Sequence, residues 1–280
     1  MKLNSLLCFL INISLLPDSK SSIRYCDFTT NDRSKYCYAK EILLAITHSP
    51  NQLAVDKSSN TLYFSFDMGQ GDFVPAVFNM DNKKLTVLNG VRDAFALASD
   101  DSSNIYFGGN NGIYRYEKQS LKQLNIKNLD IWWLYIRNNI YFIKFPNLEA
   151  HYYKNMTVKE LPELKGKVVH QFVLDKQGNV FFINGSGLYG VRRGRHRDIM
   201  LRDNPKFVGM ATDNNSDVYV CSEDGIYVVS KMVIKVKKIV NVQGVLGLTF
   251  DKLNNIVYTN AYEIVRLVPM TRKRSLFSFV

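Results

Sequence analysis

The stretch Asp213-Asn-Asn-Ser-Asp217-Val-Tyr-Val220 decides the fold, because versions of it recur along most of the chain. The pattern is an Asp, three variable residues, an Asn or Asp, and then two or three residues that favour β-strands. The copies lie about 40 residues apart, a period that is typical of the blades of a β-propeller. Five copies keep the leading residue and a sixth replaces it with Tyr, at Asp56, Asp100, Tyr135, Asp175, Asp213 and Asp251.

Each repeat unit predicts four strands. In the fifth unit the turns Asp213–Asp217 and Glu223-Asp-Gly225 contain residues that favour tight hairpins. One such sheet cannot bury both of its faces, whereas six sheets stacked radially bury one another. The sequence therefore predicts an all-β fold, a six-bladed β-propeller of four-stranded antiparallel blades. The strands expected in the fifth unit cover residues 208–212, 218–222, 226–230 and 233–240, and a second landmark recurs at Gly112, Gly187 and Gly225.

The two ends of the chain are expected to close the ring. Residues 40–45 precede the first unit and have the pattern of an outer strand, and Arg272–Phe279 follows the last unit with a similar pattern. We expect N- and C-terminal strands to meet in one blade, so that the propeller covers residues 40–280. Which of the two pairs innermost stays open.

Residues 1–22 resemble a secretory signal. Lys2 precedes an apolar run over residues 6–16 and a polar stretch over residues 17–22. That run is too short to span a membrane, and no later segment is long enough, so no membrane span is expected. A buried first strand is the alternative, but it gives no reason for the polar stretch. We expect a secreted, extracellular protein that is cleaved between Pro17 and Ile23.

Cysteine usage agrees with secretion. Residues 23–39 form an N-terminal arm in which Cys26 and Cys37 flank a short polar loop, and we expect a disulfide between them. Cys221 is either a buried free thiol or the partner of a cysteine on another chain. Three glycosylation sequons begin in turn-like places, at Asn155, Asn184 and Asn214.

The formal net charge is +11. The basic clusters Arg192–Arg197, Lys231–Lys238 and Arg272–Arg274 fall on expected outer strands or their turns. They form either a solvated rim or a surface that attracts an acidic polymer or a cell surface. A nucleic acid partner is not expected, because the chain is secreted and its aromatic residues occupy core positions rather than a stacking platform. We expect a monomer.

Strand alternation predicts the side chains that face the central channel. Trp133 stands out because the other lining residues are small; its indole either stacks on a flat ligand or plugs the channel by packing. The inner ring comprises Ala54, Ala98, Trp133, Val173, Ala211 and Thr249, and the upper ring Gln52, Ala96, Ile131, Gln171, Gly209 and Gly247. The predicted ligand-binding residues are Trp133, the amides of Gln52 and Gln171, and the loop residues Phe95, His170, Asn260 and Tyr262.

The predicted channel lacks catalytic groups. Its rings contain no carboxylate, cysteine or His pair, and calcium sites need several converging oxygens. The repeated Asp residues are explained by turns, and no Gly-x-Ser-x-Gly nucleophile motif occurs. The four histidines lack metal-ligand spacing, at His48, His151, His170 and His196. The sequence therefore predicts a protein that is not an enzyme, with no catalytic residue, metal or cofactor.

The runs Ser49–Asp56, Asn60–Phe66 and Ile105–Gly109, together with the Gly-Ile-Tyr copies and the early Cys26, resemble insect ommochrome-binding proteins. The resemblance covers most of the chain after the signal region. It implies a secreted haemolymph protein that carries a flat, often acidic pigment derived from tryptophan. No family binding motif transfers residue by residue. The third unit departs from the repeat, with Tyr135 for Asp and Trp132-Trp133 before it, and it marks a changed pocket or a changed ligand.

Three functions follow from these observations. The first is a non-enzymatic carrier of a small aromatic molecule. The second is a secreted interaction module that binds an acidic partner through its basic rim. The third, a calcium-dependent lactonase or esterase, requires loop acids such as Asp130 or Asp203 to reach the channel.

Overall fold

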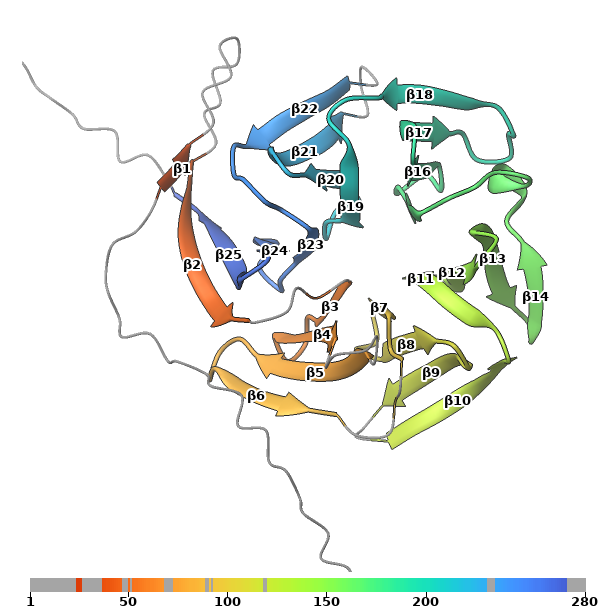
Figure 1. Cartoon of the computed structure of the whole chain (residues 1–280), viewed down its shortest axis with the longest axis horizontal. Coiled ribbons are helices and arrows are strands. Elements are labelled where there is room, and N and C mark those ends of the chain that lie inside the picture. The colour runs from red at the N-terminus through yellow and green to blue at the C-terminus, as the bar shows by residue number, and fades with distance from the viewer. Residues whose placement is uncertain are drawn as a thin grey trace, which may run out of the picture.

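Six antiparallel sheets are arranged in a ring around a central channel in this computed structural model (Figure 1). The structure describes residues 24–26, 37–46, 50, 52–67, 73–88, 91, 93–117, 120–230 and 235–270. The predicted six-bladed β-propeller is confirmed, and the first strand of each repeat unit lies innermost in its blade.

The blades follow one another in chain order, each running from the channel outward. Blade 1 contains β3 (Leu53–Asp56), β4 (Thr61–Asp67), β5 (Phe73–Asn79) and β6 (Lys84–Val87); blade 2 contains β7 (Ala96–Ser99), β8 (Ile105–Gly109), β9 (Gly112–Glu117) and β10 (Ser120–Lys127); blade 3 contains β11 (Asp130–Arg137), β12 (Asn139–Phe145), β13 (Glu149–Lys154) and β14 (Thr157–Glu160).

A short 3-10 helix, η1 (Pro162–Leu164), connects blade 3 to blade 4. Blade 4 contains β15 (Gln171–Leu174), β16 (Val180–Asn184), β17 (Gly187–Val191) and β18 (Asp198–Arg202); blade 5 contains β19 (Phe207–Thr212), β20 (Val218–Ser222), β21 (Gly225–Ser230) and β22 (Lys235–Val240); blade 6 contains β23 (Gly247–Phe250), β24 (Ile256–Thr259), β25 (Glu263–Pro269), β2 (Cys37–Ala45) and β1 (Arg24–Cys26).

Both ends of the chain build blade 6. Strand β2 pairs antiparallel with β25, and β1 adds a fifth strand outside β2 (Figure 1). Two ion pairs join β2 to β25, Lys40 Nζ to Glu263 Oε2 at 2.5 Å and Arg266 Nη2 to Glu41 Oε2 at 2.7 Å. Closure by terminal strands is therefore confirmed, with the N-terminal strand outside β25. The predicted strand Arg272–Phe279 and the predicted signal over residues 1–22 lie outside the described residues.

Where a repeat unit has its leading Asp, that residue holds the turn between the first two strands. In blade 4, Asp175 Oδ1 accepts hydrogen bonds from the backbone N–H groups of Gln177 and Asn179, each at 2.9 Å. Its other oxygen accepts from the Asn179 side chain, also at 2.9 Å. Asp251 makes the same three bonds in blade 6. The predicted structural role of these residues is therefore confirmed: their carboxylates satisfy turn N–H groups that the strands leave unpaired.

The second landmark of the repeat marks a close approach of two backbones. At Gly112 the backbone has φ +101°, and a Cβ atom there would lie 1.8 Å from the Ile126 carbonyl oxygen of the fourth strand. Gly225 shows the same arrangement in blade 5, where a Cβ atom would lie 2.3 Å from the Val240 carbonyl oxygen. Only glycine fits, because it has no Cβ and tolerates positive φ.

Apolar side chains from neighbouring blades fill the space between them. The largest cluster joins blades 3, 4 and 5 and includes Phe172 and Tyr227. Cys221 is a free cysteine in the cluster of blades 5 and 6, and burial raises the pKa of its thiol. This supports the prediction of a buried thiol over an intermolecular disulfide. No described helix is long and apolar enough to cross a membrane.

Candidate ligand site in the central channel

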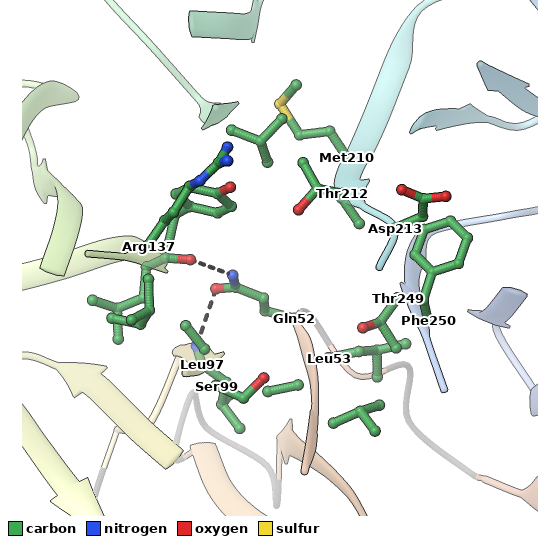
Figure 2. Close-up of a pocket in the computed structure, with 18 of the residues that line it drawn as sticks. Gln52, Leu53, Leu97, Ser99, Arg137, Met210, Thr212, Asp213, Thr249 and Phe250 are labelled. Carbon is green, nitrogen blue, oxygen red and sulfur yellow. Dashed lines mark hydrogen bonds between the residues drawn. The ribbon is translucent and has the colours of Figure 1, made fainter. Parts of the chain in front are cut away.

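The channel contains two cavities. The upper cavity, about 340 Å³, lies where the innermost strands begin, and the lower cavity, about 360 Å³, lies where they end. Side chains from all six blades line the lower cavity (Figure 2). Both volumes fall in the range of small-molecule pockets. The upper cavity is lined by Pro50, Gln52, Phe95, Trp132, Trp133, Gln171, Val208 and Leu246.

Trp133 and Gln52 line both cavities and therefore lie between them. Trp133 is 7% exposed, belongs to the core of blades 3 to 5, and donates its Nε1 hydrogen to the Phe172 carbonyl at 2.9 Å. The packing role that the sequence left open is thus present in the structure. A ligand in either cavity would also touch the indole, so the two roles are compatible.

The two predicted channel glutamines connect blades. Gln52 Nε2 donates to the Leu134 carbonyl at 2.8 Å, and its Oε1 accepts from the Leu97 N–H at 3.0 Å (Figure 2). Gln171 repeats this pattern with the Val208 carbonyl at 3.0 Å and the Met210 N–H at 3.1 Å. Each amide keeps one N–H and one lone pair for another partner.

Two β-bulges change which residues reach the upper cavity. The β11–β12 register shifts between Ile131 and Trp133, and the β19–β20 register shifts between Phe207 and Gly209. A bulge adds one residue and reverses the alternation on one side of it. Trp132 and Val208 therefore line the upper cavity in place of the predicted Ile131 and Gly209, and Phe95 and Leu246 line it in place of the predicted Ala96 and Gly247. Of these, Ile131 is fully buried in the core of blades 2 and 3, and a Cβ on Gly209 would collide with Cys221.

Aromatic rings gather at the upper cavity. Phe95 stacks on Trp132 with centroids 4.6 Å apart, and Trp132 stacks on Phe145 at 6.0 Å. Trp132 Nε1 donates to the His170 carbonyl at 3.1 Å, which holds His170 beside this stack. Burial, with a contribution from Lys206, lowers the pKa of the His170 imidazole. Phe145 is 48% exposed, so one end of the stack meets solvent.

The structure does not bring Asn260 and Tyr262 to this site. Asn260 Oδ1 accepts the N–H groups of Tyr262 and Glu263, each at 2.8 Å, and so caps the turn between β24 and β25. Tyr262 is 74% exposed. Neither residue lines the upper or the lower cavity. Trp133, Gln52, Gln171 and Phe95 do line the channel, and His170 adjoins it.

The whole predicted inner ring lines the lower cavity, as Ala54, Ala98, Trp133, Val173, Ala211 and Thr249. Two residues that the prediction did not include, Tyr135 and Arg137, also line it. They belong to the unit that lacks the repeat Asp. Without that Asp turn, β11 continues to Arg137, and the hairpin closes at Asn138, whose backbone has φ 54°.

Alternate residues of β11 connect blade 3 to blade 4. Trp133 donates to the Phe172 carbonyl, and the Tyr135 hydroxyl donates to the Leu174 carbonyl at 3.0 Å. Arg137 Nη1 donates to the Leu174 carbonyl at 3.0 Å and to the Asp175 carbonyl. Burial raises the pKa of the Tyr135 phenol, against smaller lowering effects of Thr212 and Arg137. The phenol is therefore neutral at physiological pH. The missing Asp was the sequence signal that could have located this pair.

The acids considered for hydrolysis lie away from both cavities. Asp130 begins β11, and burial together with the nearby Asp93 raises its pKa. Asp203 is exposed after β18. Neither lines the upper or lower cavity. Within the described residues, no group of three His, Cys, Asp or Glu side chains could hold a metal ion.

The basic rim is partly described. Residues 192–197 are all exposed on the hairpin between β17 and β18, and Lys235 is exposed at the start of β22. Residues 231–234 and 272–274 lie outside the described residues. Binding of an acidic partner to this rim stays a prediction.

The fold and the hollow channel define the class as six-bladed β-propellers with a ligand-sized channel. Similar solved structures include a gluconolactonase from Xanthomonas campestris (TM-score 0.66, 13% identity, 83% of this chain and 90% of that one). Regucalcin, a calcium-binding protein from Agrobacterium tumefaciens, is also similar (TM-score 0.63, 10% identity, 83% and 94%). At these identities the similarity shows the fold alone.

The family follows from sequence comparison. No family profile matches the chain. The ommochrome-binding protein of Manduca sexta is 30% identical over 242 residues, which cover 83% of this chain and 88% of that protein. The chain therefore belongs to the ommochrome-binding protein family.

Proposed function

We propose that this protein is a carrier that binds a flat aromatic small molecule in its central channel. The candidate ligands are ommochrome pigments and other tryptophan metabolites. The observation that supports this best is a channel hollow on both sides of Trp133, in a chain whose relative is an ommochrome-binding protein. Trp133, Gln52, Gln171, Phe95 and His170 are the channel residues proposed to contact the ligand.

Physical chemistry favours this ligand class. The indole of Trp133 and the rings at the upper cavity offer faces on which a planar molecule can stack. The free N–H and lone pair of each channel glutamine can pair with ring substituents. A net charge of +11 attracts acidic ligands from a distance.

Intrinsic fluorescence provides a direct test, because the two tryptophans of the chain, Trp132 and Trp133, both line the channel. We expect saturable quenching on titration with a xanthommatin-type pigment or a kynurenine-pathway compound. The Trp132→Phe variant leaves Trp133 as the reporter and keeps a ring at the upper cavity, so saturable quenching is expected to persist. Equilibrium dialysis in parallel separates binding from absorption of the exciting light.

Two outcomes would contradict the carrier assignment. One is the absence of saturable binding by the folded wild-type protein. The other is calcium-dependent hydrolysis of lactones or esters with turnover, which would favour the activity named for the gluconolactonase neighbour.

We further propose that the protein is secreted and that a Cys26–Cys37 disulfide fastens its N-terminal arm. Strand β1 pairs with β2 in a register that places Cys26 opposite Cys37. Directly opposed residues of an antiparallel pair lie within the Cα separation that a disulfide requires. We expect non-reducing peptide mapping of the secreted protein to recover these cysteines in one linked peptide pair, with Cys221 alkylated only after unfolding. Alkylation of both in the native protein would disprove the bond.

Glycans at Asn155, Asn184 and Asn214 complete the proposal of a secreted glycoprotein. Asn155 is exposed in the β13–β14 turn, and Asn184 ends β16. Asn214 is exposed and lines the lower cavity. A glycan at Asn214 would therefore stand at the opening of that cavity.

A further inference from the structure

We propose that the lower cavity binds the carboxylate of an aromatic acid, with Arg137 as the residue that recognises it. This inference rests on the proposed carrier function and deepens it, because it selects one of the two cavities and one chemical class of ligand. The geometry of Arg137, the composition of the cavity wall and the distribution of charge each support it.

Arg137 is held in place with part of its guanidinium unused. Both N–H groups of Nη1 are engaged by the Leu174 and Asp175 carbonyls. Among the described residues, no carbonyl or carboxylate accepts from Nη2 or Nε, and no described carboxylate lies within ion-pair distance of Arg137; the neighbouring Tyr135 hydroxyl is close enough to interact with the guanidinium. A guanidinium fixed on one side and open on the other is prepared for a carboxylate, since Arg binds such groups through two parallel hydrogen bonds.

The cavity offers an apolar surface for the rest of the ligand. Ala54, Ala98, Val173 and Ala211 form walls of small side chains, and Trp133 lies toward the upper cavity. Thr249 adds a hydroxyl on the side of blade 6 (Figure 2). A planar ring can therefore lie among the small residues while its carboxylate reaches Arg137.

The acids at this cavity do not cancel the charge of Arg137. Asp213 is buried, and its oxygens accept from the N–H groups of Asn215 and Asp217 and from the side chain of Asn254. Asp101 is exposed and so is Lys57, so solvent screens both charges at the rim. Arg137 is the guanidinium that lines the cavity.

The test compares a planar aromatic acid, 2-naphthoate, with its carboxamide by isothermal titration of the full-length secreted protein. We expect the wild type to prefer the acid by about tenfold or more, as for a hydrogen bond to a charged group. Arg137→Met should bind the amide as the wild type does and lose the preference for the acid. Arg137→Lys should retain a reduced preference, because it keeps the charge without the paired donors.

Two further variants locate the effect. Arg197→Met removes one positive charge from the exposed outer hairpin and should leave the preference unchanged. Ala211→Phe fills the lower cavity from β19, where Ala211 is half-buried, and should abolish binding of both acid and amide. Circular dichroism of each variant serves as the check that it is folded.

The outcomes separate this inference from the proposed function. If the wild type prefers the acid and Arg137→Met retains that preference, or if Ala211→Phe binds normally, the carboxylate site is disproved while the carrier function stands. Equal binding of acid and amide by the wild type also disproves the site alone. Binding of neither these probes nor the pigments by the wild type disproves the carrier function itself.

Discussion

Replacing Gly112 by alanine is expected to destabilise the protein by at least ~4 kcal/mol, the range reserved for severe backbone and packing damage. The new Cβ would lie 1.8 Å from the Ile126 carbonyl oxygen, and the backbone has φ +101°. The Ile126 carbonyl oxygen and the nearby Lys127 Cα are backbone atoms of the paired strand β10, so they cannot move without breaking the β9–β10 register. Urea unfolding, followed by tryptophan fluorescence, measures the change.

Gly185 provides the matched control. A Cβ there meets nothing within 4 Å, so Gly185→Ala should shift the free energy of unfolding by no more than ~0.5 kcal/mol, as for other exposed positions. Equal midpoints for the two variants would show that the close approach at Gly112 does not exist in solution.

Replacing Trp133 by alanine is expected to cost about 3–5 kcal/mol of unfolding free energy, as for other buried large-to-small changes. The indole packs in the core of blades 3 to 5, and its Nε1 bonds the Phe172 carbonyl. Its removal would also join the upper and lower cavities, because Trp133 lies between them. Differential scanning calorimetry with and without ligand measures both effects.

Trp133→Phe serves as the comparison, since it keeps an aromatic ring between the two cavities while it removes the hydrogen-bond donor and part of the ring volume. We expect it to lose about 1–3 kcal/mol, the cost of leaving a buried acceptor unpaired. A thermal midpoint for Trp133→Ala equal to that of the wild type would rule out the packing role of the indole. Because loss of the indole also changes stability, the Arg137 variants report more directly on ligand recognition.

The fold could be predicted because the repeat encodes it locally. The Asp and Asn of each unit form their turn through bonds a few residues apart, and Gly112 and Gly225 mark where two backbones meet. These contacts depend on neighbours in sequence and therefore appear as a pattern in sequence. The inner ring followed from the same regular alternation, and all of it lines the lower cavity.

The rest of the site depends on exceptions to the repeat. The bulges at Trp132 and Val208 reverse the alternation, and nothing in the local sequence requires them. Gln52 and Gln171 appeared free because their partners, such as Leu134 and Val208, belong to other blades. Asn260, predicted to lie on a loop near the channel, instead caps its own turn between β24 and β25. Tyr135 marked a departure whose consequence, an extended β11 ending at Arg137, required the structure.

The arrangement of blade 6 has a consequence for how the protein is made. Strand β2 leaves the ribosome before the other strands of blade 6 that pair with it through β25, and β25 is synthesised after all five other blades. The ring therefore stays open until β25 has been made, with the backbone edge of β2 that faces β25 unpaired, and such edges promote association between chains. Premature termination before Glu263 would leave a chain that cannot complete its ring at all.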